Sequence, residues 1–131
     1  MSEGYSNNFN NYKEQSLQTM TNGELLLLVF DELVKRMKRA KLCIERDQDK
    51  VFIESIDKSR EIVTYLIRTL DHKYPISDEL NRLYVFFNQE LAYISSSKSV
   101  QRIDTLLPMI EDMRETWKQA QIISKSNKSS K

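Results

Sequence analysis

Residues 24–30 read ELLLLVF, and this stretch decides the fold because it is apolar around its whole circumference. Successive residues of an α-helix step by about 100° around the axis, so six apolar residues in a row cover every side. A helix at the surface of a packed core needs only one apolar stripe. A second cover must therefore lie over the outer side of this segment. Two covers are available, the chain's own N-terminal segment and a partner molecule.

The composition of the whole chain favours a single all-helical domain. The chain has 131 residues, of which 40% are hydrophobic and 30% charged, with only 2 Gly and 2 Pro. Few turn-forming residues and many good helix formers are typical of helical proteins of this length. The net charge of +1 supplies no bulk field for binding nucleic acid or an anionic membrane.

The chain carries the features of a cytoplasmic protein. Cys43 is the lone cysteine, so no disulfide can form within the chain. The opening residues 1–15 lack the basic and then apolar layout of a signal peptide. No run approaches the ~18 apolar residues that a membrane span needs. We therefore expect a cytoplasmic protein that is not embedded in a membrane.

Apolar residues recur at spacings of three and four in four segments, which predicts helices over 22–46, 50–72, 78–95 and 99–123. The links between them are short, so neighbouring helices are antiparallel and the predicted fold is all-α, an up-down-up-down four-helix bundle. The residues predicted to face the core are Leu26, Phe30, Leu33, Met37, Ala40 and Ile44; Phe52, Ile56, Ser59, Val63, Leu66 and Leu70; Leu80, Leu83, Phe87, Leu91 and Ile94; and Val100, Ile103, Leu107, Ile110 and Trp117.

Local signals mark the predicted helix ends. Thr21 and Glu24 form a capping box at the start of the first helix. Ser77 is placed to cap the third helix. Pro108 lies inside the fourth helix and is expected to kink or divide it.

The chain divides into three regions. Residues 1–20 are polar at the start and form an N-terminal cap segment, residues 21–123 form the bundle, and residues 124–131 form a flexible basic tail. The predicted fold thus includes a docked and displaceable N-terminal segment.

The residues give no support to an enzyme, a cofactor or a metal site. The chain has no glycine-rich phosphate loop and a single histidine, His72, which we expect to be exposed at a helix end. Cys43 lies beside a core stripe, as expected of a partly buried, inert thiol. The five cations between residues 35 and 41 spread over more than half the circumference of the helix, which favours a solvated face over a nucleic-acid site.

Large side chains flank the core stripes of the second and third helices. They include Ile62, Tyr65, Tyr84 and Tyr93. Each belongs either to a wide core stripe or to a surface that a partner covers, and the residues alone leave both readings open. Together they are more apolar surface than four modest helices can bury, which favours a partner site for helical segments.

Residues 12–25, YKEQSLQTMTNGEL, resemble the opening motif of the FliS family of flagellar export chaperones: a Tyr, an apolar residue five positions on, a Thr, and a capping segment that ends in Glu-Leu. Residues 56–70 are similar to the family's second-helix signature. Residues 83–91 resemble its Leu-Tyr segment, and residues 113–117 its closing Arg-x-x-Trp. The likeness runs in one order over residues 12–120. Departures include Asn22 in place of a usual Pro, and Pro108 in the last helix.

The resemblance implies a function without catalysis. Members bind the C-terminal segment of flagellin, prevent its premature polymerisation and deliver it to the type III export apparatus, so the implied partners are flagellin and a component of the flagellar export gate. The alternative is a self-associating helical bundle without a secretion client. Formation of a homodimer when the client is absent stays open.

The contacts with the client follow from the large side chains that lie off the core stripes. We expect them at Leu27, Leu28, Ile62, Tyr65, Tyr84 and Tyr93. The resemblance further implies that the N-terminal segment covers a groove and moves when the client binds, with Tyr12 and Leu17 as its apolar anchors.

Overall fold

The computed structural model describes residues 22–129, with side chains through residue 123. This part of the chain is all-α and has no strand. Its helices, in chain order, are α2 (Asn22–Glu45), α3 (Asp49–Arg68), α4 (Ile76–Ser97) and α5 (Val100–Ser129). The predicted all-α, four-helix fold is confirmed, whereas the predicted docked N-terminal segment lies outside the described residues.

Tight turns at one end of the molecule make the helices antiparallel. Asp47, between α2 and α3, and Lys98, between α4 and α5, both adopt left-handed backbone conformations, with φ of 54° and 53°. The ammonium group of Lys98 lies 2.7 Å from the Asp49 carboxylate at the start of α3, which ties the turns together. We call this the turn end, and the opposite end, where α2 begins, the open end.

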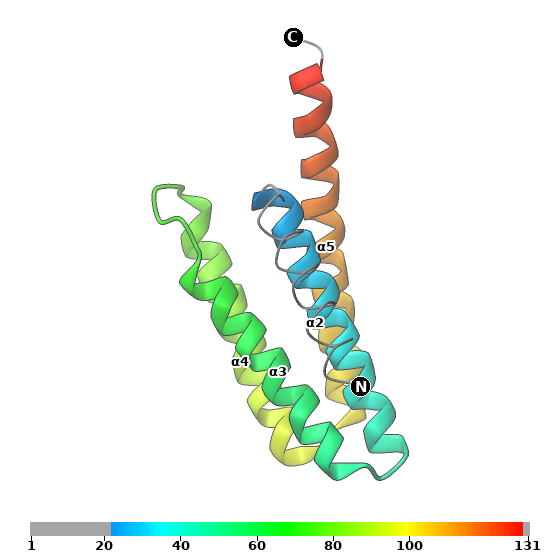
Figure 1. Ribbon diagram of the computed structural model, residues 1–131. Coiled ribbons are helices and arrows are strands. Elements are labelled where there is room, and N and C mark those ends of the chain that lie inside the picture. Colours follow the sequence, from blue (N-terminus) through cyan, green and yellow to red (C-terminus); the bar gives the residue numbers. More distant parts are fainter. Residues whose placement is uncertain (1–21, 130–131) are drawn as a thin grey trace, which may run out of the picture.

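The bundle widens from the turn end to the open end. In Figure 1, α3 lies beside α4 and α2 beside α5, and the two pairs diverge toward the start of α2. Two ion pairs hold α2 against α5, one between Lys41 and Asp104 at 2.8 Å and one between Asp31 and Arg114. Each carboxylate raises the pKa of its basic partner by hydrogen bonding.

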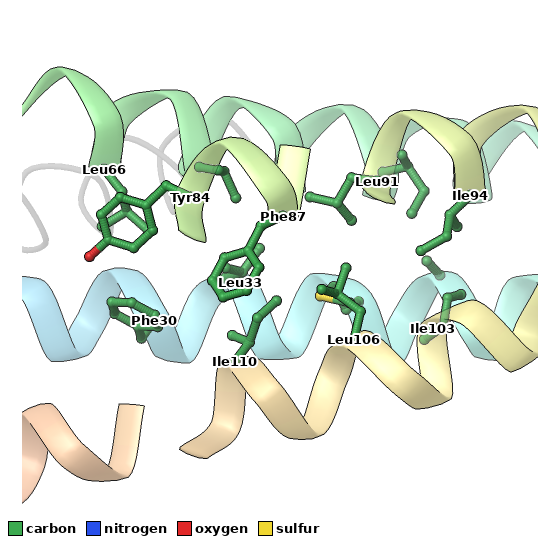
Figure 2. Close-up of a cluster of buried hydrophobic side chains, with 14 of the residues drawn as sticks. Phe30, Leu33, Leu66, Tyr84, Phe87, Leu91, Ile94, Ile103, Leu106 and Ile110 are labelled. Carbon is green, nitrogen blue, oxygen red and sulfur yellow. The ribbon is translucent and has the colours of Figure 1, made fainter. Parts of the chain in front are cut away.

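All four helices contribute to one apolar core (Figure 2). The ring of Tyr84 lies between those of Phe30 and Phe87, with centroid separations of 6.4 and 6.3 Å. Three small residues, Ala40 of α2 and Ser55 and Ser59 of α3, are also buried. The buried apolar residues are Phe30, Leu33, Met37, Ala40, Cys43, Phe52, Ile56, Val63, Leu66, Tyr84, Phe87, Leu91, Ile94, Ile103, Leu106 and Ile110.

Three predicted core positions are displaced by one residue. Cys43 is buried in place of Ile44, Tyr84 in place of Leu83, and Leu106 in place of Leu107. Adjacent residues at the edge of a stripe satisfy the three-four spacing equally well, so the angle at which the helices pack selects between them. The predicted residues that are only half-buried are Leu26, Ile44, Leu70, Leu80, Leu83, Val100, Leu107 and Trp117.

Several predicted features of the helix ends are wrong. Helix α3 ends at Arg68 instead of residue 72. The backbone of Thr69 leaves the helical conformation, with φ of −94° and ψ of 3°, and the Leu70 amide donates three residues back, to the Ile67 carbonyl at 3.3 Å. Ser77 does not cap α4, since it is buried inside that helix, which Pro75 precedes. The predicted cap residue Thr21 lies outside the described residues.

Helix α5 is a single helix through Pro108, so the expectation that this proline divides it is wrong. Proline removes one N–H from the helix, and water can hydrate the carbonyl of Asp104 that loses its donor, because both residues are exposed. The backbone stays helical to Ser129, beyond the predicted end at residue 123.

Candidate binding grooves

A groove of about 520 Å³ lies between α2 and α3. Its lining residues recur at three-four spacing, so each helix presents one face to it. Three of the predicted contact residues, Leu28, Ile62 and Tyr65, meet here. The lining residues are Leu25, Leu28, Val29, Glu32, Arg36, Lys58, Glu61, Ile62 and Tyr65.

The floor of the α2–α3 groove is apolar and its rim is charged. Leu28 and Tyr65 are half-buried without joining the packed core, whereas Val29 and Ile62 pack against the core from the groove side. The rim charges pair within their own helices, Glu32 with Arg36 at 3.7 Å and Lys58 with Glu61 at 3.3 Å. A floor of this kind with a polar rim suits the apolar face of an amphipathic helix.

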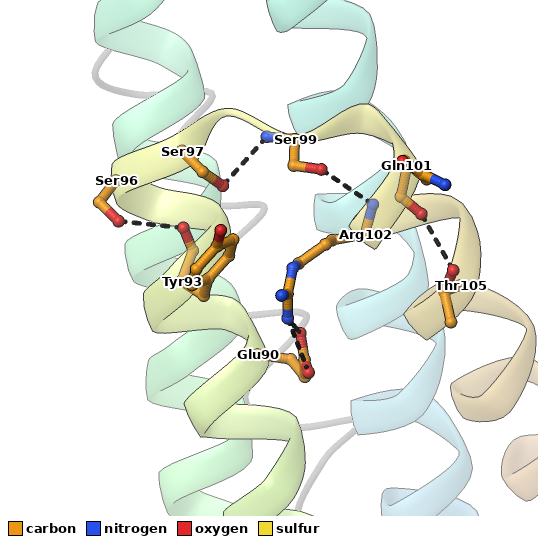
Figure 3. Close-up of polar contacts among 8 residues, drawn as sticks. All are labelled: Glu90, Tyr93, Ser96, Ser97, Ser99, Gln101, Arg102 and Thr105. Atoms are coloured by element: carbon orange, nitrogen blue, oxygen red, sulfur yellow. Dashed lines mark hydrogen bonds and ion pairs between the residues drawn. The ribbon is translucent and has the colours of Figure 1, made fainter.

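A second groove, of about 490 Å³, lies between α4 and α5. Figure 3 shows Arg102 of α5 reaching across it, with its guanidinium carbon 3.7 Å from the centre of the Tyr93 ring. The Nη1 group of Arg102 also donates to both carboxylate oxygens of Glu90, at 3.1 and 2.9 Å. These contacts leave Tyr93 49% exposed, beside the half-exposed side chains of Phe86 and Met109.

Hydrogen bonds to serine hydroxyls hold the backbone in place at the turn end of the α4–α5 groove. The amide of Arg102 donates to the Ser99 hydroxyl at 3.2 Å, so Ser99 caps the start of α5. The Ser99 amide donates in turn to the Ser97 hydroxyl at 3.3 Å. Glu90 raises the pKa of Arg102, chiefly through their hydrogen bonds, and the guanidinium makes a cation–π contact with the Tyr93 ring.

A smaller recess of about 300 Å³ lies between the start of α2 and the far half of α5. It is lined by Leu26 and Trp117, and the indole N–H of Trp117 lies near the hydroxyl of the buried Tyr84 without the geometry of a full hydrogen bond. Burial raises the pKa of Tyr84 to about 12, and the indole lowers it by a smaller amount. Tyr84 therefore stays neutral at physiological pH.

The structure corrects one predicted contact residue. Tyr84 is 2% exposed, so the expectation that its ring lies off the core stripe is wrong. Its ring fills the space between Phe30 and Phe87, where the bundle begins to widen. The remaining expectations stay predictions. Leu27 is half-buried but lines neither groove, and Tyr12 and Leu17 lie outside the described residues.

Several lining residues of both grooves were not predicted as contacts from the sequence. Leu25 lies on the same face of α2 as Leu28 and Arg36. Because the sequence already indicates a second apolar side on this helix, the spacing of these residues could have predicted Leu25 as a lining residue. No sequence pattern predicts Met109 and Arg102 as lining residues, because that role depends on which face of α5 packs toward α4.

Among residues 22–123, no three His, Cys, Asp or Glu side chains are grouped closely enough to hold a metal ion. None of the helices in the described part of the chain combines the length and apolar character needed to cross a membrane.

The family comparison and a curated relative point to the same family. Residues 5–124 match the family model described as flagellar protein FliS. The chain is 25% identical over 114 residues to the flagellar secretion chaperone FliS of Bacillus subtilis (strain 168), a match that covers 87% of this chain and 86% of that protein. It also resembles a crystal structure of a flagellar chaperone from bacteria, with a TM-score of 0.73 and 14% identity, over 88% of this chain and 95% of that one. This last likeness concerns the fold.

Proposed function

Because the chain belongs to the FliS family of flagellar chaperones, we propose that it binds the C-terminal segment of flagellin in the cytoplasm. Binding prevents flagellin from polymerising prematurely. The complex then delivers flagellin to a component of the type III export gate. The family is one of chaperones, so the chain acts by binding and not by catalysis.

The α2–α3 groove is the observation that carries this proposal. It brings together Leu28, Ile62 and Tyr65, three side chains that the sequence pattern predicts to contact a client. The groove also lies on the outer side of the ELLLLVF segment, where a second cover is required. An amphipathic helix laid along the groove supplies that cover and buries its own apolar face.

The α4–α5 groove is a second binding site for the same client. It lies on a different pair of helices, and it offers Phe86, Tyr93 and Met109 as partly exposed apolar contacts. A client that is unstructured when free must bury a large surface to offset the entropy lost on ordering. Two separate grooves suit a client that wraps around the bundle.

Residues 1–21 serve as a displaceable lid on the α2–α3 groove. They join α2 at Asn22, close to Leu25 and Leu28 of the groove floor. Leu17 and Tyr12 precede Asn22 by five and ten residues, so an extended chain lets them reach ~17 and ~33 Å from it, far enough to cover the floor. Burying two such side chains is worth about 2–5 kcal/mol before ordering costs, weak enough for a wrapping client to displace.

Titration calorimetry with purified full-length flagellin and with flagellin lacking its C-terminal segment tests the function. We expect the full-length protein to bind and the truncated one to fail. Equal binding of both proteins would contradict the proposal. Absence of binding, combined with a tight oligomer of the client-free chain in light scattering, would instead support the self-associating bundle.

A further inference from the structure

The rim of the α2–α3 groove places its two cations at one level of the bundle. Arg36 lies nine residues before the end of α2 at Glu45, and Lys58 lies nine residues after the start of α3 at Asp49. Since the helices run antiparallel from one short turn, equal distances along them correspond to equal heights. Arg36 and Lys58 therefore face each other across the groove and form a cationic level.

The two anions of the rim form a second level. Glu32 lies thirteen residues before the end of α2, and Glu61 lies twelve residues after the start of α3. This anionic level is about one helical turn, or ~6 Å, closer to the open end than the cationic level. The apolar floor extends from there toward the open end, so the groove has a direction along its length.

These four charges are available to a ligand. The Glu32 and Arg36 side chains are 33% and 35% exposed, and those of Glu61 and Lys58 are 67% and 59% exposed. Each pair lies within a single helix, where exposed ion pairs contribute little to stability. Exchanging these partners for charges on a bound helix therefore costs little.

We propose that this rim sets the direction and the charge register of the bound client helix. The inference rests on the proposed function and adds to it how the helix is seated. The helix lies parallel to α2, with its apolar face on the floor. At the level of Glu32 and Glu61, the client helix carries a basic side chain. One turn further along the client helix, at the level of Arg36 and Lys58, it carries an acidic side chain.

The helix dipole favours the same direction. A helix that runs parallel to α2 brings its carbonyl end, which carries partial negative charge, toward Arg36 and Lys58. The reversed helix would bring partially positive amides to the same cations. Direction and register are thus selected by the same two residues.

The rim also discriminates between the client and the lid. The charged residues of segment 1–21 are Glu3, Lys13 and Glu14. None of them has an opposite charge three or four residues away, which is the spacing that pairs side chains along one face of a helix. The segment cannot satisfy both levels as a helix, whereas a client with a base and an acid one turn apart does.

A full rim reversal tests the charge register. The variant E32K/R36E/K58E/E61K keeps the net charge and keeps opposite charges within each helix. Its affinity for the C-terminal segment of the same organism's flagellin should fall about tenfold in low salt, and the difference should shrink at about 1 M salt. The control variant K41D/D104K reverses an α2–α5 ion pair that lines neither groove and should bind like the wild type.

A nitroxide label at the C-terminal end of the bound helix tests its direction. The label should broaden amide signals near Arg36 and spare those near Leu25. Wild-type affinity of the rim-reversed chain in low salt, or broadening centred on Leu25, would overturn the inference while the flagellin-binding function stands. If the rim reversal acts only when residues 1–21 are present, the charges serve the lid, and the inference is also overturned. Failure of the wild type to bind the segment would reject the function itself.

Discussion

The guanidinium of Arg102 on α5 lies over the ring of Tyr93 on α4, 3.7 Å from its centre, while its Nη1 group is bound to Glu90. This bridge holds Tyr93 at the surface of the α4–α5 groove in a fixed orientation (Figure 3). Tyr84, nine residues earlier on the same helix, is buried among Phe30 and Phe87 instead. Two tyrosines of one helix thus have different roles, one in the core and one in a groove.

Replacing Tyr84 and Tyr93 separately should distinguish these roles. Tyr84→Ala removes a buried ring and should lower the free energy of unfolding by about 3–5 kcal/mol. Tyr93→Ala should leave the melting temperature nearly unchanged and weaken the binding of the flagellin segment several-fold, as expected for a partly exposed contact. Urea unfolding and calorimetry measure the two effects. A strong loss of stability in Tyr93→Ala would place that ring in the core.

Truncation of Leu66 or Phe87 should test the packing shown in Figure 2. Both side chains are buried at the meeting of the helices, so Leu66→Ala and Phe87→Ala should each cost about 2–5 kcal/mol. Tyr74→Ala is a suitable control, because its side chain is 63% exposed and should change stability by less than about 0.5 kcal/mol. Near-neutral values for Leu66 and Phe87 would show that the core lies elsewhere.

The raised pKa of Tyr84 predicts a loss of stability in alkaline solution. The folded pKa is about 12, above the ordinary value of 10.0, so the unfolded chain releases this proton first as the pH rises. The contribution is present below pH ~10 and is lost between pH ~10 and ~12, amounting to roughly 1–2 kcal/mol after allowance for solvent screening. Urea unfolding at several pH values should show a smaller alkaline loss for Tyr84→Phe than for the wild type. Equal losses would contradict the burial of the hydroxyl.

Deletion of residues 1–18 should test the proposed lid. The helical circular dichroism signal should remain, because the buried core residues described above all lie between Phe30 and Ile110. Binding of a dye for exposed apolar surface should increase, and light scattering should show larger species, since the groove floor loses its cover. Unfolding of the variant would show that the segment belongs to the core. If neither dye binding nor association changes, something else covers the floor.

The sequence predicted the number, order and type of the helices, because the three-four spacing of apolar residues is a direct consequence of helix geometry. It was less successful at the margins of each stripe. Leu83 and Tyr84 fit that spacing equally well, and only the packing of the other helices against α4 decides between them. The end of α3 depends on the local backbone turn at Thr69, after which the Leu70 amide donates to Ile67, and the spacing of apolar residues does not report such a turn.

The candidate site was predicted in part for the same reason. Leu28, Ile62 and Tyr65 stand out as large side chains beside a core stripe, and the structure brings them into one groove. The α4–α5 groove was harder to foresee, since the contact of Arg102 with Glu90 and Tyr93 joins two helices at a register that the sequence does not specify. Contacts between helices depend on tertiary packing, whereas a sequence pattern describes only one helix at a time.

The central claim, that the α2–α3 groove holds the flagellin segment, is tested most directly by removing its floor without touching the core. Leu28 and Tyr65 line the groove but do not belong to the packed cluster, so L28A/Y65A should keep its melting temperature. Leu42→Ala, at an exposed leucine of α2 that lines neither groove, is the matched control. Calorimetry should show an affinity for the flagellin C-terminal segment at least about thirtyfold weaker in the double variant and unchanged in the control. Wild-type affinity in a folded L28A/Y65A variant would contradict the account.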